Sequence, residues 1–195
     1  MFQCLALACL AIFYGCYFGK MLLQKRKGIQ TDQIGKGKSG TAKQIEIVMK
    51  IATILVPFAE VISIAVNTTA LPYVLRIAGL ILAVLGDMVF IVSVMTMRDS
   101  WRAGVSETEK TNLVTNGIYQ LSRNPAFLGF DLIYLGVLLM FFNVPLLLFS
   151  LFAAIMFHVQ IVFVEEPFLM RQFGDVYQNY TRKTRRYLGC RNKEE

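Results

Sequence analysis

Five blocks of apolar residues, separated by short polar segments, run along the chain. A stretch of about 18 or more apolar residues with few charges can cross the hydrocarbon core of a membrane as one helix. Four of the blocks reach that length, and the fourth along the chain is shorter. The pattern therefore predicts an all-α, multi-pass membrane protein with about five transmembrane helices. The blocks cover residues 1–23, 45–66, 73–97, 127–142 and 144–164.

Only Asn143 separates the last two blocks, and Pro145 lies two positions beyond it, so we predict that these two helices form a tight hairpin. The segment 165–188 has apolar residues at helical spacing among charged ones. This pattern predicts an amphipathic helix that lies on or just beneath the membrane. Its apolar positions are Phe168, Leu169, Phe173, Val176, Tyr177 and Tyr180.

Lysine and arginine gather in segments 24–44, 98–124 and 171–193, whereas the links at 67–72 and Asn143 contain neither. Loops rich in Lys and Arg lie on the cytoplasmic side of membrane proteins. All three basic segments fall on one side if the N-terminus lies outside. We therefore predict an integral membrane protein with an external N-terminus and a cytoplasmic C-terminus.

Composition supports the membrane interpretation. Of the 195 residues, 55% are hydrophobic and 17% are charged, against roughly 45–50% and about 25% in ordinary globular domains. A net charge of +7 would suggest a nucleic-acid partner in a soluble protein. Because these cations flank the spans, we interpret them as contacts to anionic membrane lipids and expect no nucleic-acid partner. The four cysteines form no CxxC or Cys/His cluster, so we expect no metal site and no disulfide framework.

Two segments partly resemble a signal peptide and a phosphate-binding loop, but their details favour other interpretations. The first apolar block is followed, rather than preceded, by the basic run Lys25-Arg26-Lys27, so we interpret it as a retained span and not a signal peptide. The polar segment 24–44 contains four glycines, which are costly to order, and is predicted to be a flexible cytoplasmic loop. Its run 35–40 lacks the spacing of a phosphate-binding loop and has no preceding strand, so nucleotide binding is not favoured.

Ionisable side chains inside the apolar blocks are functional candidates, because a charge in the membrane is costly. Glu60, Asp87, Asp131 and His158 qualify by position. The acids could equally make hydrogen bonds between helices, and the histidine could be a packed polar residue. Their positions alone do not decide between these interpretations.

A denser group of polar residues lies at the cytoplasmic ends of the last two spans. Arg123 precedes Pro125, which suits the first turn of a helix. Its guanidinium can pair with a carboxylate or phosphate, or can reach lipid headgroups. Glu165-Glu166 follow the last span, where two carboxylates need cationic partners: Arg123, the cluster at 182–186, or an ammonium or sulfonium ligand. Alternatively, the pair simply begins the amphipathic helix.

These residues form an ordered set that resembles the isoprenylcysteine carboxyl methyltransferase family, much of which the related phospholipid methyltransferases share. The resemblance covers about residues 98–188, roughly half the chain, and its order and spacing make it more specific than any single motif. It rests on Leu113-Val114-Thr115, Gly117-Ile118-Tyr119, Arg123-Asn124-Pro125, Phe127, Gly129, Glu165-Glu166, Phe173-Gly174, Tyr177, Tyr180 and Arg186.

The resemblance implies transfer of a methyl group from S-adenosylmethionine to a lipophilic or lipid-like acceptor at the cytoplasmic face. It implies that Glu165 binds the polar end of the cofactor and that Arg123 and Glu166 organise the reaction centre as catalytic residues. The other expected cofactor-binding residues are Asn112, Leu113, Val114, Tyr119, Asn124, Pro125, Ala126 and Phe127.

Three positions depart from the family pattern. The family usually has histidine where this chain has Asn124, and often tyrosine where it has Phe127. Asparagine keeps a hydrogen-bonding side chain but cannot act as an imidazole base. The prenylcysteine enzymes also place an arginine within the last span, where this chain reads Gln160-Ile161-Val162-Phe163. A prenylcysteine carboxylate is therefore not favoured as the substrate, and the acceptor could be a carboxylate or an amine.

The chain is expected to divide into an N-terminal three-span scaffold, 1–97, and a catalytic region, 98–195. Two alternatives to a methyltransferase stay open. One is an NADPH-dependent membrane reductase of the sterol type, which carries a similar Arg-x-Pro segment and basic tail. The other is a catalytically inactive membrane scaffold of the same fold.

Overall fold

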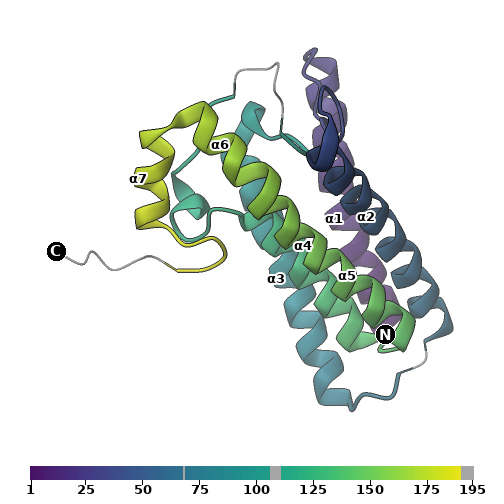
Figure 1. Ribbon diagram of the computed structural model, residues 1–195. Coiled ribbons are helices and arrows are strands. Elements are labelled where there is room, and N and C mark those ends of the chain that lie inside the picture. The colour runs from purple at the N-terminus through teal and green to yellow at the C-terminus, as the bar shows by residue number, and fades with distance from the viewer. Residues whose placement is uncertain (68, 106–110, 190–195) are drawn as a thin grey trace.

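The computed structural model describes residues 1–67, 69–105 and 111–189. Within them α1–α5 form an elongated bundle, α6 continues the line of α5, and α7 turns aside at the end of the bundle farthest from the N-terminus (Figure 1). The α-helices are α1 (Phe2–Arg26), α2 (Gly40–Val66), α3 (Tyr73–Met97), α4 (Pro125–Met140), α5 (Val144–Gln160), α6 (Glu166–Phe173) and α7 (Asp175–Lys183). Short helical turns are η1 (Arg98–Ser100), η2 (Gly117–Gln120) and the π-helical η3 (Ile161–Glu165).

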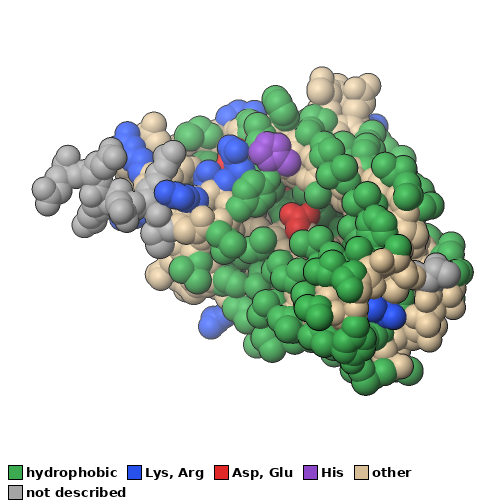
Figure 2. Space-filling view, turned by 90° about the horizontal axis from the view of Figure 1, so that it is seen from below, with side chains coloured by type: hydrophobic (Ala, Val, Ile, Leu, Met, Phe, Trp, Pro, Cys, Tyr) green, Lys and Arg blue, Asp and Glu red, His purple; other side chains and the backbone are tan. Residues whose placement is uncertain are grey.

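Four helical stretches of the described chain are long and apolar enough to cross a membrane: Phe2–Arg26, Gly40–Val66, Tyr73–Ser100 and Val144–Phe173. The predicted all-α membrane fold is confirmed. At 16 residues, α4 is about 24 Å long, shorter than a hydrocarbon core of roughly 30 Å. Hydrophobic side chains cover most of the face seen in Figure 2, as expected for helices that meet lipid.

Glycines bring α3 and α4 into close contact. A Cβ added to Gly79 would lie 2.6 Å from the Gly136 carbonyl oxygen, and one added to Gly136 would lie 2.6 Å from the Ala83 nitrogen. Gly86 and Gly129 repeat the arrangement farther along the same two helices. Small residues let helix backbones approach and gain packing contacts that the lipid cannot supply. This contact holds α4 in the bundle.

The hairpin between α4 and α5 is as predicted. Asn143 begins α5, and its side-chain oxygen accepts a hydrogen bond from the Leu146 nitrogen at 2.9 Å. Its amide nitrogen donates to the Ser63 hydroxyl at 2.7 Å. One side chain therefore caps α5 and joins the hairpin to the end of α2.

The expectation of a flexible loop at 24–44 is wrong, because its backbone pairs with the segment after α3. The Gln33 nitrogen donates to the Ala103 carbonyl at 2.9 Å, and the Ala103 nitrogen donates to the Thr31 carbonyl at 3.0 Å. The buried Thr31 hydroxyl donates to the Gln24 side chain at 2.7 Å. Positive φ angles at its glycines, such as 76° at Gly28, let the chain turn without steric strain.

The C-terminal segment also differs from the prediction of one surface helix over 165–188. The last span continues without interruption through η3 into α6, and the helix ends at Gly174, whose φ of 50° favours glycine. α7 then runs in a new direction, and residues 184–189 return to residues 121–124. Of the six predicted apolar positions, Val176 is exposed and the other five line a cavity.

Candidate functional site

A cavity of about 430 Å³ lies at the end of the bundle that carries α6 and α7, and residues of both helices line it. Ligand pockets commonly have roughly 300–1,000 Å³. Nine of the eleven residues predicted for the site line this cavity: Asn112, Leu113, Val114, Tyr119, Arg123, Asn124, Ala126, Phe127 and Glu165. The other two, Pro125 and Glu166, lie beside it.

Local structure explains how the central motif reaches the cavity. Gly117 has a φ of 58° and opens η2, which positions the buried Tyr119. A Cβ on Gly117 would lie 3.2 Å from Thr96, so the turn sits close against α3. Pro125 occupies the first turn of α4, where its missing N–H costs no hydrogen bond. The turn and the helix start thus hold the segment between them at the rim of the cavity.

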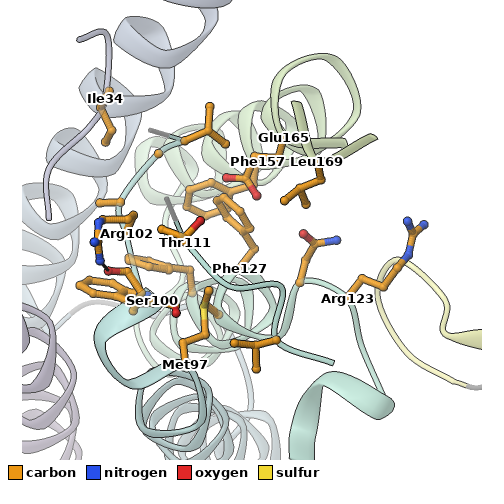
Figure 3. A pocket seen from close by; sticks show the side chains of 18 of the residues that line it. Ile34, Met97, Ser100, Arg102, Thr111, Arg123, Phe127, Phe157, Glu165 and Leu169 are labelled. Carbon is orange, nitrogen blue, oxygen red and sulfur yellow. Dashed lines mark hydrogen bonds between the residues drawn. The ribbon is translucent and has the colours of Figure 1, made fainter. Parts of the chain in front are cut away.

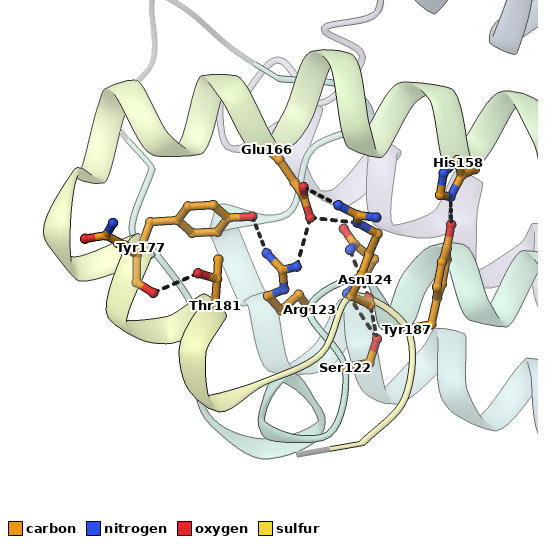
Figure 4. A network of polar contacts seen from close by, with 10 residues as sticks. Ser122, Arg123, Asn124, His158, Glu166, Tyr177, Thr181 and Tyr187 are labelled. Atoms are coloured by element: carbon orange, nitrogen blue, oxygen red, sulfur yellow. Dashed lines mark hydrogen bonds and ion pairs between the residues drawn. The ribbon is translucent and has the colours of Figure 1, made fainter. Parts of the chain in front are cut away.

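The side chain of Glu166 joins two arginines (Figure 4). Its carboxylate lies 3.0 Å from Arg123 Nη2 and accepts hydrogen bonds from Arg186 at 2.9 and 2.7 Å. Arg123 Nη1 also donates to the Tyr177 hydroxyl at 3.1 Å. The hydrogen bonds of Glu166 raise the pKa of Arg186. Burial raises the pKa of Tyr177 to about 12, so this phenol remains neutral at physiological pH.

The segment after α7 completes the network through backbone contacts. The Arg123 nitrogen donates to the Arg185 carbonyl at 3.1 Å, and the Asn124 side chain donates to the Arg186 carbonyl at 3.0 Å. On the other side of the turn, the Tyr180 hydroxyl donates to the Tyr119 carbonyl. Residues that lie about 60 positions apart in the sequence therefore form one unit.

The adjacent acids Glu165 and Glu166 face different surroundings. Figure 3 shows Glu165 beside Phe157 and Leu169 on the α5–α6 side of the cavity. It lies within electrostatic reach of Lys38, Glu46 and Gln160. The expectation that nearby arginines compensate the pair holds for Glu166, through Arg123 and Arg186. Glu165 instead faces a region that the first half of the chain supplies.

A sequence model described as phospholipid methyltransferase matches residues 74–176, more than half of the chain. The chain belongs to this methyltransferase family. It is also 42% identical over 72 residues to protein-S-isoprenylcysteine O-methyltransferase of Schizosaccharomyces pombe. That alignment spans 36% of this chain and 30% of the relative.

The residues that match the methyltransferase family form only part of the cavity. Tyr14, Tyr17 and Phe18 from α1 and Met49 and Ile54 from α2 make an apolar wall. Polar residues before position 74 line it as well. The sequence-based division into scaffold and catalytic region did not predict these contributions, because apolar span residues carry no motif.

One signal could have indicated them. Glu46 and Lys50 are charged residues four positions apart in the second apolar block, and so lie on one face of α2. In the structure Lys50 pairs with Asp32 at 2.8 Å, and both residues line the cavity. Glu46 is fully buried and pairs with Lys38.

The intramembrane candidates lie elsewhere. Glu60 and Asp87 are buried, and neither Glu60 oxygen has a hydrogen-bond partner among the described residues. Asp131 is half-buried on α4. His158 is exposed, and its Nδ1 lies 2.6 Å from the Tyr187 hydroxyl. None of the four is among the described residues that line the cavity.

The part of the chain that the structure describes holds no cluster of three or more potential metal ligands.

Proposed function

We propose that the protein is an S-adenosylmethionine-dependent methyltransferase that acts on a lipophilic acceptor at the cytoplasmic face of a membrane. The observation that carries this proposal is the convergence of nine motif residues on one cavity in a member of a methyltransferase family. The cavity has both a polar rim and an apolar wall, as a polar cofactor and a lipophilic acceptor would require.

The charges beside the cavity suit both ligands. Among the described residues near Glu165, two carboxylates share one lysine, Lys38, and a sulfonium or ammonium group is a complementary ligand there. Around Glu166, the described residues supply two arginines that share this one carboxylate, so they carry an excess of positive charge. Arg123 lines the cavity and could orient an anionic part of the acceptor.

The residues around the cofactor would bind and orient it. Glu165 would hold its cationic end, while Tyr119, Ala126, Phe127 and the segment 112–114 would enclose the rest. When bound, the cofactor would supply an electrophilic methyl carbon, attached to its sulfonium sulfur, for attack by an acceptor lone pair; the electron pair of the carbon–sulfur bond would remain on the sulfur. Holding the two partners in line and excluding water is the main catalytic contribution that such a site can make.

Three expected site residues take more specific proposed roles. Arg123 lines the cavity, so we propose that it touches the acceptor as a catalytic residue. Glu166 lies behind it and would position its guanidinium. Asn124 lines the cavity, and its amide nitrogen donates a hydrogen bond to the Arg186 carbonyl. Its side-chain oxygen would then contact the cofactor or the acceptor.

The acceptor would enter from the membrane, past the apolar wall. Asn124 in place of the family histidine, and the absence of arginine from the sequence 160–163, favour an acceptor other than a prenylcysteine carboxylate. An amine would have to arrive deprotonated, whereas a carboxylate needs no base. The basic segments favour an external N-terminus, and with that orientation the cavity would lie on the cytoplasmic side.

Binding of S-adenosylhomocysteine to the purified protein in detergent tests the proposal directly. Isothermal titration should show saturable binding, and radiolabelled S-adenosylmethionine should transfer label into a membrane lipid extract. The absence of heat at high micromolar ligand, in protein shown to be folded, would exclude this cofactor. Thermal stabilisation by NADPH alone would favour the reductase alternative, and binding without transfer would favour an inactive scaffold.

A further inference from the structure

A buried carboxylate at the start of α2 joins the N-terminal loop to the last span. The side chains of Glu46 and Lys38 are 0% and 3% exposed and form an ion pair. The Gly35 nitrogen donates to the second Glu46 oxygen. From α5, Gln160 Nε2 donates to the first oxygen at 3.3 Å. One carboxylate thus holds two loop positions and α5 together.

Gln160 connects this group to the cavity. It is fully buried and is the last residue of α5 before the π-helical segment that ends at Glu165. A π-helical segment shifts the direction of the side chains that follow, and such segments are frequent at functional sites. Glu165 lies within electrostatic reach of Gln160, Glu46 and Lys38, and of these four residues only Glu165 is among those that line the cavity.

Stability alone does not account for such a group. A buried ion pair loses so much hydration that apolar residues of similar volume often stabilise a protein as well or better. Here the pair lies beside a further carboxylate, and the Gln160 side-chain oxygen is buried with no hydrogen-bond partner among the described residues. A positive charge carried by a ligand at Glu165 would balance the second carboxylate.

We infer that Glu46 and Gln160 are positioning residues that orient Glu165 toward the cationic end of the cofactor, with Lys38 fixing Glu46 in place. The N-terminal part of the chain that precedes the matched family region at 74–176 would then take part in cofactor binding. This inference rests on the proposed function, because it needs a cationic ligand at Glu165.

The decisive variant is Gln160→Met, which removes the link between Glu46 and α5 without changing charge or much volume. It should weaken S-adenosylhomocysteine binding about five- to tenfold, which corresponds to the loss of one ordinary hydrogen bond of about 1 kcal/mol. The KM for S-adenosylmethionine should rise with it, while the KM for acceptor in a lipid extract stays unchanged. A residue with a purely structural role would lower the melting temperature without this split.

A double-mutant cycle shows whether the effect passes through Glu165. In a Glu165→Ala background, Gln160→Met should have no further effect on affinity, because the group that it orients is gone. The double variant Lys38→Met/Glu46→Gln removes the buried pair without leaving one charge alone, and should reproduce the loss. Asp99→Asn is the control, since the side chain of Asp99 forms an exposed ion pair with Lys27, and this variant should bind like the wild type.

The possible failures are distinguishable. A folded wild-type protein that binds no S-adenosylhomocysteine overturns the proposed function and this inference with it. If the wild type binds S-adenosylhomocysteine and both Gln160→Met and Lys38→Met/Glu46→Gln bind it with the same affinity, this inference is overturned but the proposed function is not. The inference is also overturned if Gln160→Met lowers the affinity for S-adenosylhomocysteine equally with and without the Glu165 carboxylate, because the effect would then not pass through Glu165.

Discussion

The Glu166 carboxylate lies 3.0 Å from the Arg123 guanidinium and 2.7 Å from that of Arg186. These three side chains come from the loop before α4, the start of α6 and the segment after α7. One acid therefore fixes an arginine at the cavity rim and also holds the segment after α7 beside it. This arrangement leads to the first prediction.

Glu166→Gln should reduce methyl transfer more than it reduces cofactor binding. The neutral amide leaves two arginines without their charged partner, and Arg123 loses its orientation. Displacement of such a group by about an ångström can cost roughly a hundredfold in rate. Cofactor binding should change less, because Glu166 is not among the described cavity-lining residues. The kcat with a lipid extract and the S-adenosylhomocysteine affinity by titration measure the two effects separately.

The matched control for Glu166→Gln is Asp99→Asn. The pair between Lys27 and Asp99 is exposed, with side chains that are 59% and 53% accessible. Exposed pairs contribute less than about 1 kcal/mol, so this variant should keep wild-type activity and stability. Equal losses in the two variants would mean that Glu166 has no special relationship to Arg123.

Glu165→Ala should weaken S-adenosylhomocysteine binding by about 1.5–3 kcal/mol, the contribution of a hydrogen bond to a charged group. Titration calorimetry measures this change. Asp131→Asn is a suitable control, because Asp131 is a carboxylate on α4 outside the described cavity lining. Unchanged affinity in Glu165→Ala would remove this residue from the cofactor site.

Gly136→Ala should destabilise the bundle by about 1–3 kcal/mol, since its Cβ would lie 2.7 Å from the Gly79 oxygen and the two helices would have to separate. Gly15→Ala is its control in α1, where an added Cβ meets nothing within 4 Å. That control should be neutral or slightly stabilising. Thermal unfolding in detergent compares the two, and equal midpoints would show that the α3–α4 contact can relax at no cost.

Asn124→Ala should loosen the segment after α7, because the hydrogen bond to the Arg186 carbonyl is lost. The expected loss of stability is about 0.5–1.5 kcal/mol, with faster proteolysis at residues 184–189. Thr181→Ala is a comparison variant, because its hydroxyl donates a hydrogen bond within α7, to the Gln178 carbonyl. Proteolysis of Asn124→Ala at the wild-type rate would contradict a role in holding this segment.

The spans and the hairpin could be predicted from the sequence, since long apolar blocks in a membrane have few alternatives to helices. Asn143 and Pro145 marked the hairpin because they favour a helix start. The sequence predicted a C-terminal helix. It predicted neither the break at Gly174 nor the contact of residues 184–189 with residues 121–124. Apolar positions at helical spacing show that one face is covered, but they do not show whether lipid or another part of the protein covers it.

Motif order by itself grouped Arg123 with Glu165 and Glu166, and the family match covers these positions. Only the tertiary structure separated the two acids, because adjacent residues on a helix point in directions about 100° apart. It also brought Glu46 and Lys50 of α2 to the site, together with Lys38 from a glycine-rich loop whose backbone pairs with the distant residue Ala103 and whose sequence has no regular pattern. The sequence thus determined which segments cross the membrane, and the packing of those segments decided which charges face one another.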